Sequence, residues 1–204
     1  MKYAKMLGLL AVAAAALMAF AATASATTGT DSAGGSPVEV GDTIHATNVG
    51  EAVLDGTVNI KCKKSTVIGT VGSAGSATTT LSGNISTLTF EECGANTVTV
   101  LNKGNLEAHT DPEGQPANGN GTLTSTGAEV TVLTHNILGT VHCEYVTSET
   151  DVGTLDGSNN TGKTATLTVD SVPIPRRSTD FGCGSTSEWT AEYTVVTPDY
   201  LAID

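Results

Sequence analysis

Residues 53–63 read VLDGTVNIKCK, and this stretch carries the pattern that decides the fold. Its apolar members share one side of an extended chain: Leu54, Val58, Ile60 and Cys62. The polar or charged residues between them fall on the other side. Side chains alternate between the two faces of a β-strand, so a period of two predicts a strand with one buried face. We therefore predict a half-buried strand over 53–63.

The same alternation recurs along the chain. It is clear in TVHCEY (140–145) and SEWTAEYTV (187–195), and shorter runs repeat it at 97–101, 129–133 and 164–169. Val and Thr dominate these runs, and Gly, Asn, Asp and Pro separate them, which is typical of strands joined by turns. About ten antiparallel strands of this kind favour an all-β fold, a single β-sandwich. Two smaller domains are the alternative.

One segment breaks the alternation. In TTTLSGNISTLTF (78–90), Leu81 and Ile85 occupy odd positions, whereas Leu88 and Phe90 occupy even ones. A β-bulge inserts one extra residue and so shifts the parity of the side chains that follow. The pattern predicts either a bulge near Ser86 or two separate short strands.

The start of the chain has the layout of a secretory signal. Lys2 and Lys5 precede an apolar run from Met6 to about Phe20, and Ala24-Ser25-Ala26 supplies the small residues of a cleavage site. We expect cleavage after Ala26, with an uncleaved membrane anchor as the alternative. A processed chain has no stable membrane span and is secreted or held at the cell surface.

This layout predicts three regions. Residues 1–26 are the signal peptide, residues 27–37 (TTGTDSAGGSP) are a flexible lead-in of small and polar residues, and residues 38–204 are the β-sandwich domain. Cleavage removes two of 9 basic residues and none of 21 acidic ones, which gives the processed chain a net charge of 7 − 21 = −14. Such a chain lacks the basic surface that nucleic acids require, so nucleic acid is not an expected partner.

The four cysteines lie in a weak internal repeat: Cys62, Cys93, Cys143 and Cys183. Each half has a cysteine on an alternating strand and ends with a Phe, Cys and Gly motif, FEECG (90–94) or FGCG (181–184). An exported chain meets an oxidising environment, where an even number of cysteines normally pairs. Three connectivities are open, and the repeat favours Cys62–Cys93 and Cys143–Cys183.

The Thr-rich pattern, the strand NISTLTFEEC and the terminal segment SEWTAEYTVVTP resemble a group of uncharacterised exported actinobacterial β proteins. The likeness covers most of residues 40–197. The group has no assigned activity, so the resemblance implies an exported β protein and supplies no functional residues.

The octapeptide GSNNTGKT (157–164) matches the phosphate-binding pattern G-x-x-x-x-G-K-[ST]. That motif requires a helix after its Gly-rich turn, so that backbone N–H groups hold the phosphates. Here an alternating run with Pro173 and Pro175 follows, which predicts a strand. The corresponding loop of the first half, GSAGSATTT (72–80), has no lysine. We therefore expect no NTP binding and interpret the match as a loop of the repeat.

Oxygen donors gather in ETDVGTLDGSNN (149–160), where the candidate calcium ligands are Asp151, Asp156, Asn159 and Asn160. Their spacing is not that of an EF-hand, and no cofactor is otherwise expected. The turn HTDPEG (109–114) is a weaker metal candidate. No recognised nucleophile motif accompanies the four histidines, and His142 is expected on the solvent face of its strand.

These features favour a non-catalytic exported structural or binding protein of the cell surface or extracellular space, with an unidentified partner there. Two alternatives stay open: a secreted hydrolase whose site is assembled from distant residues, and a calcium-dependent adhesion module. A deep cleft that holds a His and a carboxylate would favour the first, and clustered loop carboxylates the second.

Overall fold

The computed structural model describes residues 27–32, 35–57, 59–76, 79–110, 119–136, 139–158, 164–178 and 182–203. Every regular element in these ranges is a β-strand, as predicted. In chain order the strands are β1 (Gly29–Thr30), β2 (Thr43–Asp55), β3 (Ile60–Cys62), β4 (Lys64–Ser76), β5 (Thr79–Glu91), β6 (Thr97–Asn102), β7 (Asn105–Thr110), β8 (Gly121–Thr126), β9 (Glu129–Asn136), β10 (Gly139–Val146), β11 (Thr150–Asp156), β12 (Thr166–Pro175), β13 (Thr186–Thr197) and β14 (Ala202–Ile203). Within the described ranges, no helix has the length and apolarity needed to cross a membrane.

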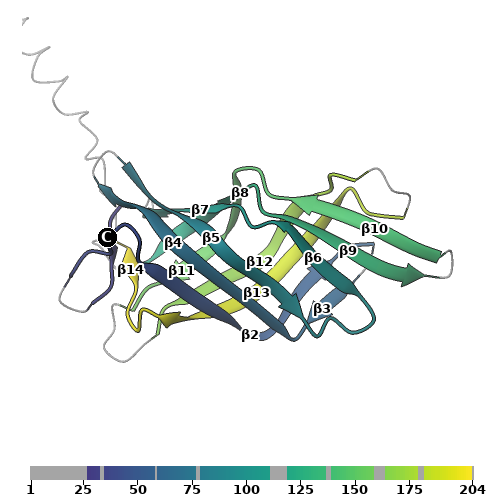
Figure 1. Ribbon diagram of the computed structural model, residues 1–204, viewed down its shortest axis with the longest axis horizontal. Helices are drawn as coiled ribbons and strands as arrows, with labels where there is room; N and C mark the ends of the chain where they lie inside the picture. Colours follow the sequence, from purple (N-terminus) through teal and green to yellow (C-terminus); the bar gives the residue numbers. More distant parts are fainter. Residues whose placement is uncertain are drawn as a thin grey trace, which may run out of the picture.

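The larger sheet closes into a barrel (Figure 1). Its strands follow the order β13-β12-β11-β8-β7-β5-β4-β2, and β13 pairs in turn with β2, so eight antiparallel strands form a ring. β3 is an additional strand that pairs with the C-terminal end of β2. The sequence predicted a single β-sandwich of about ten antiparallel strands instead. Alternation along each strand is the same in a sandwich and in a barrel, and only the long-range pairing of β13 with β2 separates them.

The ring can be divided into two arcs of four strands in sequence order, β2-β4-β5-β7 and β8-β11-β12-β13. In each arc the two central strands form a hairpin, β4–β5 or β11–β12. A strand with a cysteine precedes each hairpin, β3 or β10, and the disulfide partner of that cysteine follows the hairpin. The arcs join at β7–β8 and at β13–β2. The two halves thus share the order of a cysteine strand, a hairpin and a second cysteine, but β3 and β10 pair in different sheets and no described strand between β12 and β13 corresponds to β6.

Both disulfides have the pairing that the repeat predicts, Cys62–Cys93 and Cys143–Cys183. The two cysteines are 31 residues apart in sequence in the first disulfide and 40 residues apart in the second. Loops of these lengths correspond to about 3.5–4 kcal/mol of stabilisation each in the chain-entropy treatment. All four cysteines belong to one cluster of buried residues, so the two covalent links reinforce the same part of the core.

A three-stranded sheet, in the order β10-β9-β6, packs on one end of the barrel (Figure 1). Its inward side chains, among them Val132, Val141 and Tyr145, join the cysteine cluster together with Ile60 of β3 and Ile174 of β12. At this end two β-layers pack face to face, which is the arrangement expected of a sandwich. The stacking is local, because the larger sheet continues into the closed ring.

The two ends of the described chain meet at the opposite end of the barrel. Gly29 pairs with Ile203 and Thr30 with Ala202, so β1 and β14 form a two-stranded clasp. Ile203 is 2 % exposed and packs in the barrel core, and its N–H donates to the carbonyl oxygen of Gly119 at 3.0 Å. Part of the segment predicted to be a flexible lead-in thus lies within the fold.

The stretch 53–63 is not one strand. β2 ends at Asp55 and β3 begins at Ile60, and the two strands pair with Leu54 opposite Ile60. Asp55-Gly56 is a common hairpin signal, and here it marks the reversal of the chain. The single-strand prediction was wrong because the chain reverses between Asp55 and Ile60. Leu54 and Ile60 are an even number of residues apart, so both side chains face the same core and the apolar alternation looks unbroken.

The bulge predicted near Ser86 is present in β5. Ile68 of β4 pairs with Thr87, and the next residue, Gly69, pairs with Ile85, so Ser86 is the extra residue. Its hydroxyl donates to the carbonyl oxygen of Ile68 at 3.0 Å. The bulge shifts the parity, so apolar side chains before and after it face the barrel interior.

Candidate functional site

The barrel interior contains two adjoining cavities, of about 100 and 110 Å³. Both are lined by Val67, Ile85, Leu106 and Leu167, which stand where the two cavities meet. Protein interiors are usually packed as densely as organic crystals, with few voids larger than a water molecule. Unfilled space of this size in a small barrel is therefore the feature of the structure that most resembles a binding site.

Strand alternation places the side chains of this wall. The inward residues of the barrel strands are mainly Val, Leu, Ile and Ala, and the described residues that line either cavity include no Asp, Glu, Lys, Arg or His. The first cavity lies toward the three-stranded sheet, which adds Val98, Val130 and Val132 to its wall. The second lies toward the clasp, which adds Leu201 and Ile203. Each cavity thus has a covered end and an apolar wall.

Tyr193 is the most buried polar side chain on the wall of the first cavity, with 0 % of its surface exposed. Its phenolic oxygen lies 2.8 Å from the hydroxyl oxygen of Ser65, which is 2 % exposed. Burial raises the pKa of Tyr193 to about 12, and the hydrogen bond with Ser65 opposes this rise. The phenol is therefore neutral, and able to donate a hydrogen bond, across the physiological pH range.

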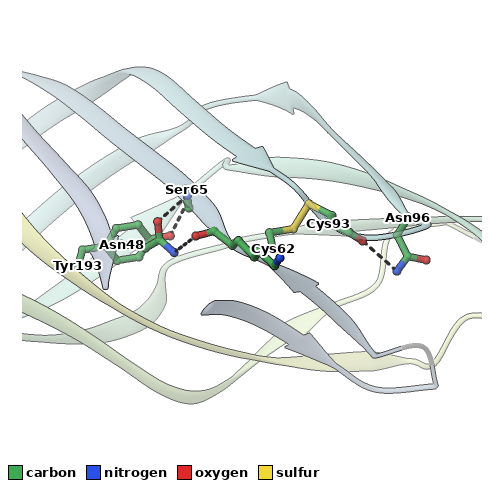
Figure 2. The surroundings of a disulfide bond; sticks show 7 residues. Asn48, Cys62, Ser65, Cys93, Asn96 and Tyr193 are labelled. Carbon is green, nitrogen blue, oxygen red and sulfur yellow. Dashed lines mark hydrogen bonds between the residues drawn. A yellow bond between two sulfur atoms is a disulfide. The ribbon is translucent and has the colours of Figure 1, made fainter. Parts of the chain in front are cut away.

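Asn48 fixes the position of Ser65, as Figure 2 shows. The backbone N–H of Ser65 donates to Asn48 Oδ1 at 2.7 Å. Asn48 Nδ2 donates to the carbonyl oxygens of Lys63 and Gly50, at 3.1 and 2.7 Å. The side chain thus bridges the point where the partner of β2 changes from β4 to β3. An amide at this position completes the backbone hydrogen bonds that the change of partner interrupts.

A second pair of buried hydroxyls, Ser125 and Thr147, also lines the first cavity. Their oxygens are 3.0 Å apart. The backbone N–H of Ala128 donates to Thr147 Oγ1 at 2.9 Å, and the Thr147 hydroxyl reaches the Ala128 carbonyl oxygen at 3.5 Å. These bonds join Ser125 of β8 and Ala128, just before β9, to Thr147 in the segment between β10 and β11. They therefore link the barrel to the start of the three-stranded sheet.

Comparisons with protein-family models, with curated proteins and with solved structures find no match to this chain. Its function is therefore inferred from the site itself.

The candidate calcium ligands are only partly described. Asp151 and Asp156 lie at opposite ends of β11, roughly 16 Å apart at the usual rise along a strand. Asp151 Oδ1 accepts a hydrogen bond from Thr124 Oγ1 at 3.0 Å. Asn159 and Asn160 lie outside the described residues. The part of the chain that the structure describes brings no three His, Cys, Asp or Glu side chains into a group suited to a metal ion.

The phosphate-loop match falls partly outside the described ranges, at residues 159–163. The element that follows it is β12, which begins at Thr166. A phosphate loop requires a helix there, so the context predicted from the sequence is confirmed. Of the turn 109–114, only His109 and Thr110, at the end of β7, are described. His142 is exposed on β10, as its place in the alternation predicts.

Sequence reasoning did not identify the interior as a site. Alternation put Tyr193 on the apolar face of its strand, which is a signal for burial but not for a cavity. Ser65 gave no signal, because it lies 128 residues away from Tyr193 and the ring of strands alone brings them together. Cavities arise where side chains from many strands fail to fill the barrel, and no local pattern records that.

Proposed function

We propose that the protein is an exported, non-catalytic binding protein whose barrel interior takes up one small apolar molecule. Export is supported by the signal-like start of the chain and by two disulfides, which persist in oxidising compartments. Binding rather than catalysis is supported by the wall of the interior, which offers hydroxyl groups, apolar surface and the indole N–H of Trp189, which has no hydrogen-bond partner among the described residues. The cavities are the observation that carries the proposal.

The sizes of the cavities agree with this use. Empty volume in a core costs about 24 cal/mol per Å³, which is about 2.5 kcal/mol for each cavity. A ligand that fills the space regains contacts that the side chains of the wall do not make with one another. Apolar cavities of roughly 150 Å³ stay dry and bind molecules such as benzene. Eight-stranded barrels are just wide enough to hold one small ligand.

The test is the thermal unfolding of the processed, oxidised protein with and without benzene. A ligand that binds only the folded state raises the unfolding midpoint. The double variant Ala52→Val/Ala108→Val narrows both cavities, since each alanine lines one of them. Ala95→Val makes one such substitution at an exposed turn and serves as the control for the change of side chain.

We expect benzene to raise the midpoint of the wild type and of Ala95→Val, and to raise that of the double variant much less. Absence of a shift in the wild type near the solubility limit of benzene, or an equal shift in all three proteins, refutes interior binding.

A further inference from the structure

The hydroxyl pair of Ser65 and Tyr193 has one more donor than the fold uses. Each hydroxyl carries one hydrogen, and two hydroxyls that bond to each other use only one of the two. The oxygens are 2.8 Å apart, and among the described residues neither hydroxyl has a second hydrogen-bond partner. One hydrogen of the pair is therefore left for an acceptor that the described chain does not provide.

The nearest amide does not supply that acceptor. The oxygen of Asn48 accepts from the backbone N–H of Ser65 (Figure 2). Its nitrogen donates to the two carbonyl oxygens of Lys63 and Gly50. Both amide hydrogens are used, so Asn48 acts as a support for Ser65. A buried donor without an acceptor destabilises a protein, and such groups are uncommon in native structures.

The second hydroxyl pair shows the contrast. The Thr147 hydroxyl donates to the carbonyl oxygen of Ala128 at 3.5 Å, which leaves the Ser125 hydroxyl as the donor to Thr147. The N–H of Ala128 donates to Thr147 Oγ1. Every hydroxyl hydrogen of that pair has an acceptor within the protein. Both pairs are buried at the same cavity end of the barrel, yet only the Ser65–Tyr193 pair has a donor to spare.

Tyr193 lines the first cavity, whereas Ser65, its hydrogen-bond partner, is not one of the lining residues. When Ser65 donates to Tyr193, the phenolic hydrogen is the one available to a molecule in the cavity. We propose that the interior ligand carries a hydrogen-bond-accepting oxygen, and that the Tyr193 hydroxyl, backed by Ser65, binds it. This inference rests on the proposed function.

The same wall excludes a charged ligand. The described lining residues of both cavities contain no cationic or anionic side chain. A carboxylate or an ammonium group buried there without a partner loses its hydration with no compensation. The ligand class is therefore a small, neutral and largely apolar ketone, ester, ether or alcohol. Its apolar body fills the cavity, and its oxygen faces Tyr193.

The test uses two probes of nearly the same shape, cyclohexanone and methylenecyclohexane, which differ in having C=O or C=CH₂. Their dissociation constants are measured by NMR titration for the wild type, Tyr193→Phe and Ser65→Ala. Tyr193→Phe removes the phenolic oxygen and keeps the ring. Ser65→Ala keeps the phenol of Tyr193 and removes only the hydroxyl that is hydrogen-bonded to it in the protein. The affinity for methylenecyclohexane reports whether each variant keeps an intact cavity.

We expect Tyr193→Phe to weaken cyclohexanone binding about three- to tenfold and to leave methylenecyclohexane binding unchanged within about twofold. We expect Ser65→Ala to bind cyclohexanone at least as tightly as the wild type does. Equal changes for both probes in Tyr193→Phe, or no change for either, overturn the assignment of the oxygen and leave interior binding in place. Failure of both probes and of benzene to bind the wild type overturns both proposals.

Discussion

Deletion of Ser86 tests whether the bulge in β5 sets the orientation of the strand. Ser86 is the extra residue between the pairs Ile68–Thr87 and Gly69–Ile85. Without it, alternation forces the residues on one side of the deletion onto the opposite face. Either Leu88 and Phe90 or Leu81 and Ile85 then turn outward.

The cost follows from the side chains that change faces. Leu88 is 8 % exposed and Leu81 is 6 % exposed, and each is accompanied by a second apolar residue that lines a cavity. Exposing one such side chain costs about 1.5–3 kcal/mol. Two of them give about 3–6 kcal/mol, a large part of the 5–15 kcal/mol by which a domain is usually stable.

The matched control is Ser86→Ala, which keeps the extra residue and removes only the hydroxyl that donates to the Ile68 carbonyl oxygen. Loss of that bond costs about 0.5–1.5 kcal/mol. Urea denaturation, followed by tryptophan fluorescence, gives the free energy of unfolding for both variants and the wild type. If the deletion is no more destabilising than Ser86→Ala, the bulge does not set the orientation of β5 and the register described above is wrong.

Two further predictions concern the disulfides and Tyr193. Replacing Cys62 and Cys93 by alanine, or Cys143 and Cys183, should lower the free energy of unfolding by about 3.5–4 kcal/mol in either case. Urea denaturation of each double variant measures this loss. A loss below about 1 kcal/mol would contradict the loop-closure account. The pKa of Tyr193 is about 12 in the folded protein, compared with 10.0 for an unperturbed tyrosine. The neutral phenol therefore stabilises the fold fully below pH 10, and this stabilisation is lost as the pH rises through 12. The wild type should therefore lose about 2–3 kcal/mol more than Tyr193→Phe between pH 9 and pH 12; parallel pH profiles of the two proteins would count against the buried position of this side chain.

Local features of the fold were predictable from the sequence. In residues 78–90 the apolar positions change from odd to even numbers, which indicates the bulge at Ser86. This signal is local, because the extra residue of a bulge shifts the alternation of the residues next to it. The disulfide pairing follows from the repeat of a cysteine strand, a hairpin and a second cysteine. The alternation at 140–145 predicts the burial of Val141, Cys143 and Tyr145, all of which are at most 8 % exposed.

Features that depend on distant residues were not predictable. Alternation cannot show whether a sheet is open, and the barrel is closed by pairs such as Thr194 with Thr47. The hairpin within 53–63 was missed because its turn preserves the apolar pattern. The cavities depend on the combined volume of side chains from eight strands, and the spare hydroxyl hydrogen depends on the contact of Tyr193 with Ser65.

The pairing of β13 with β2 also determines when the molecule can be completed. β2 is the first strand of the ring to be synthesised and β13 is the last, so one edge of β2 has no partner until residues 186–197 have emerged. Unpaired strand edges promote aggregation, and contacts between residues far apart in sequence form slowly. Neither half of the chain can cover its own outer edges, because each arc takes its last neighbour from the other. We therefore expect a chain truncated before β13 to associate with other chains rather than to persist as a folded half.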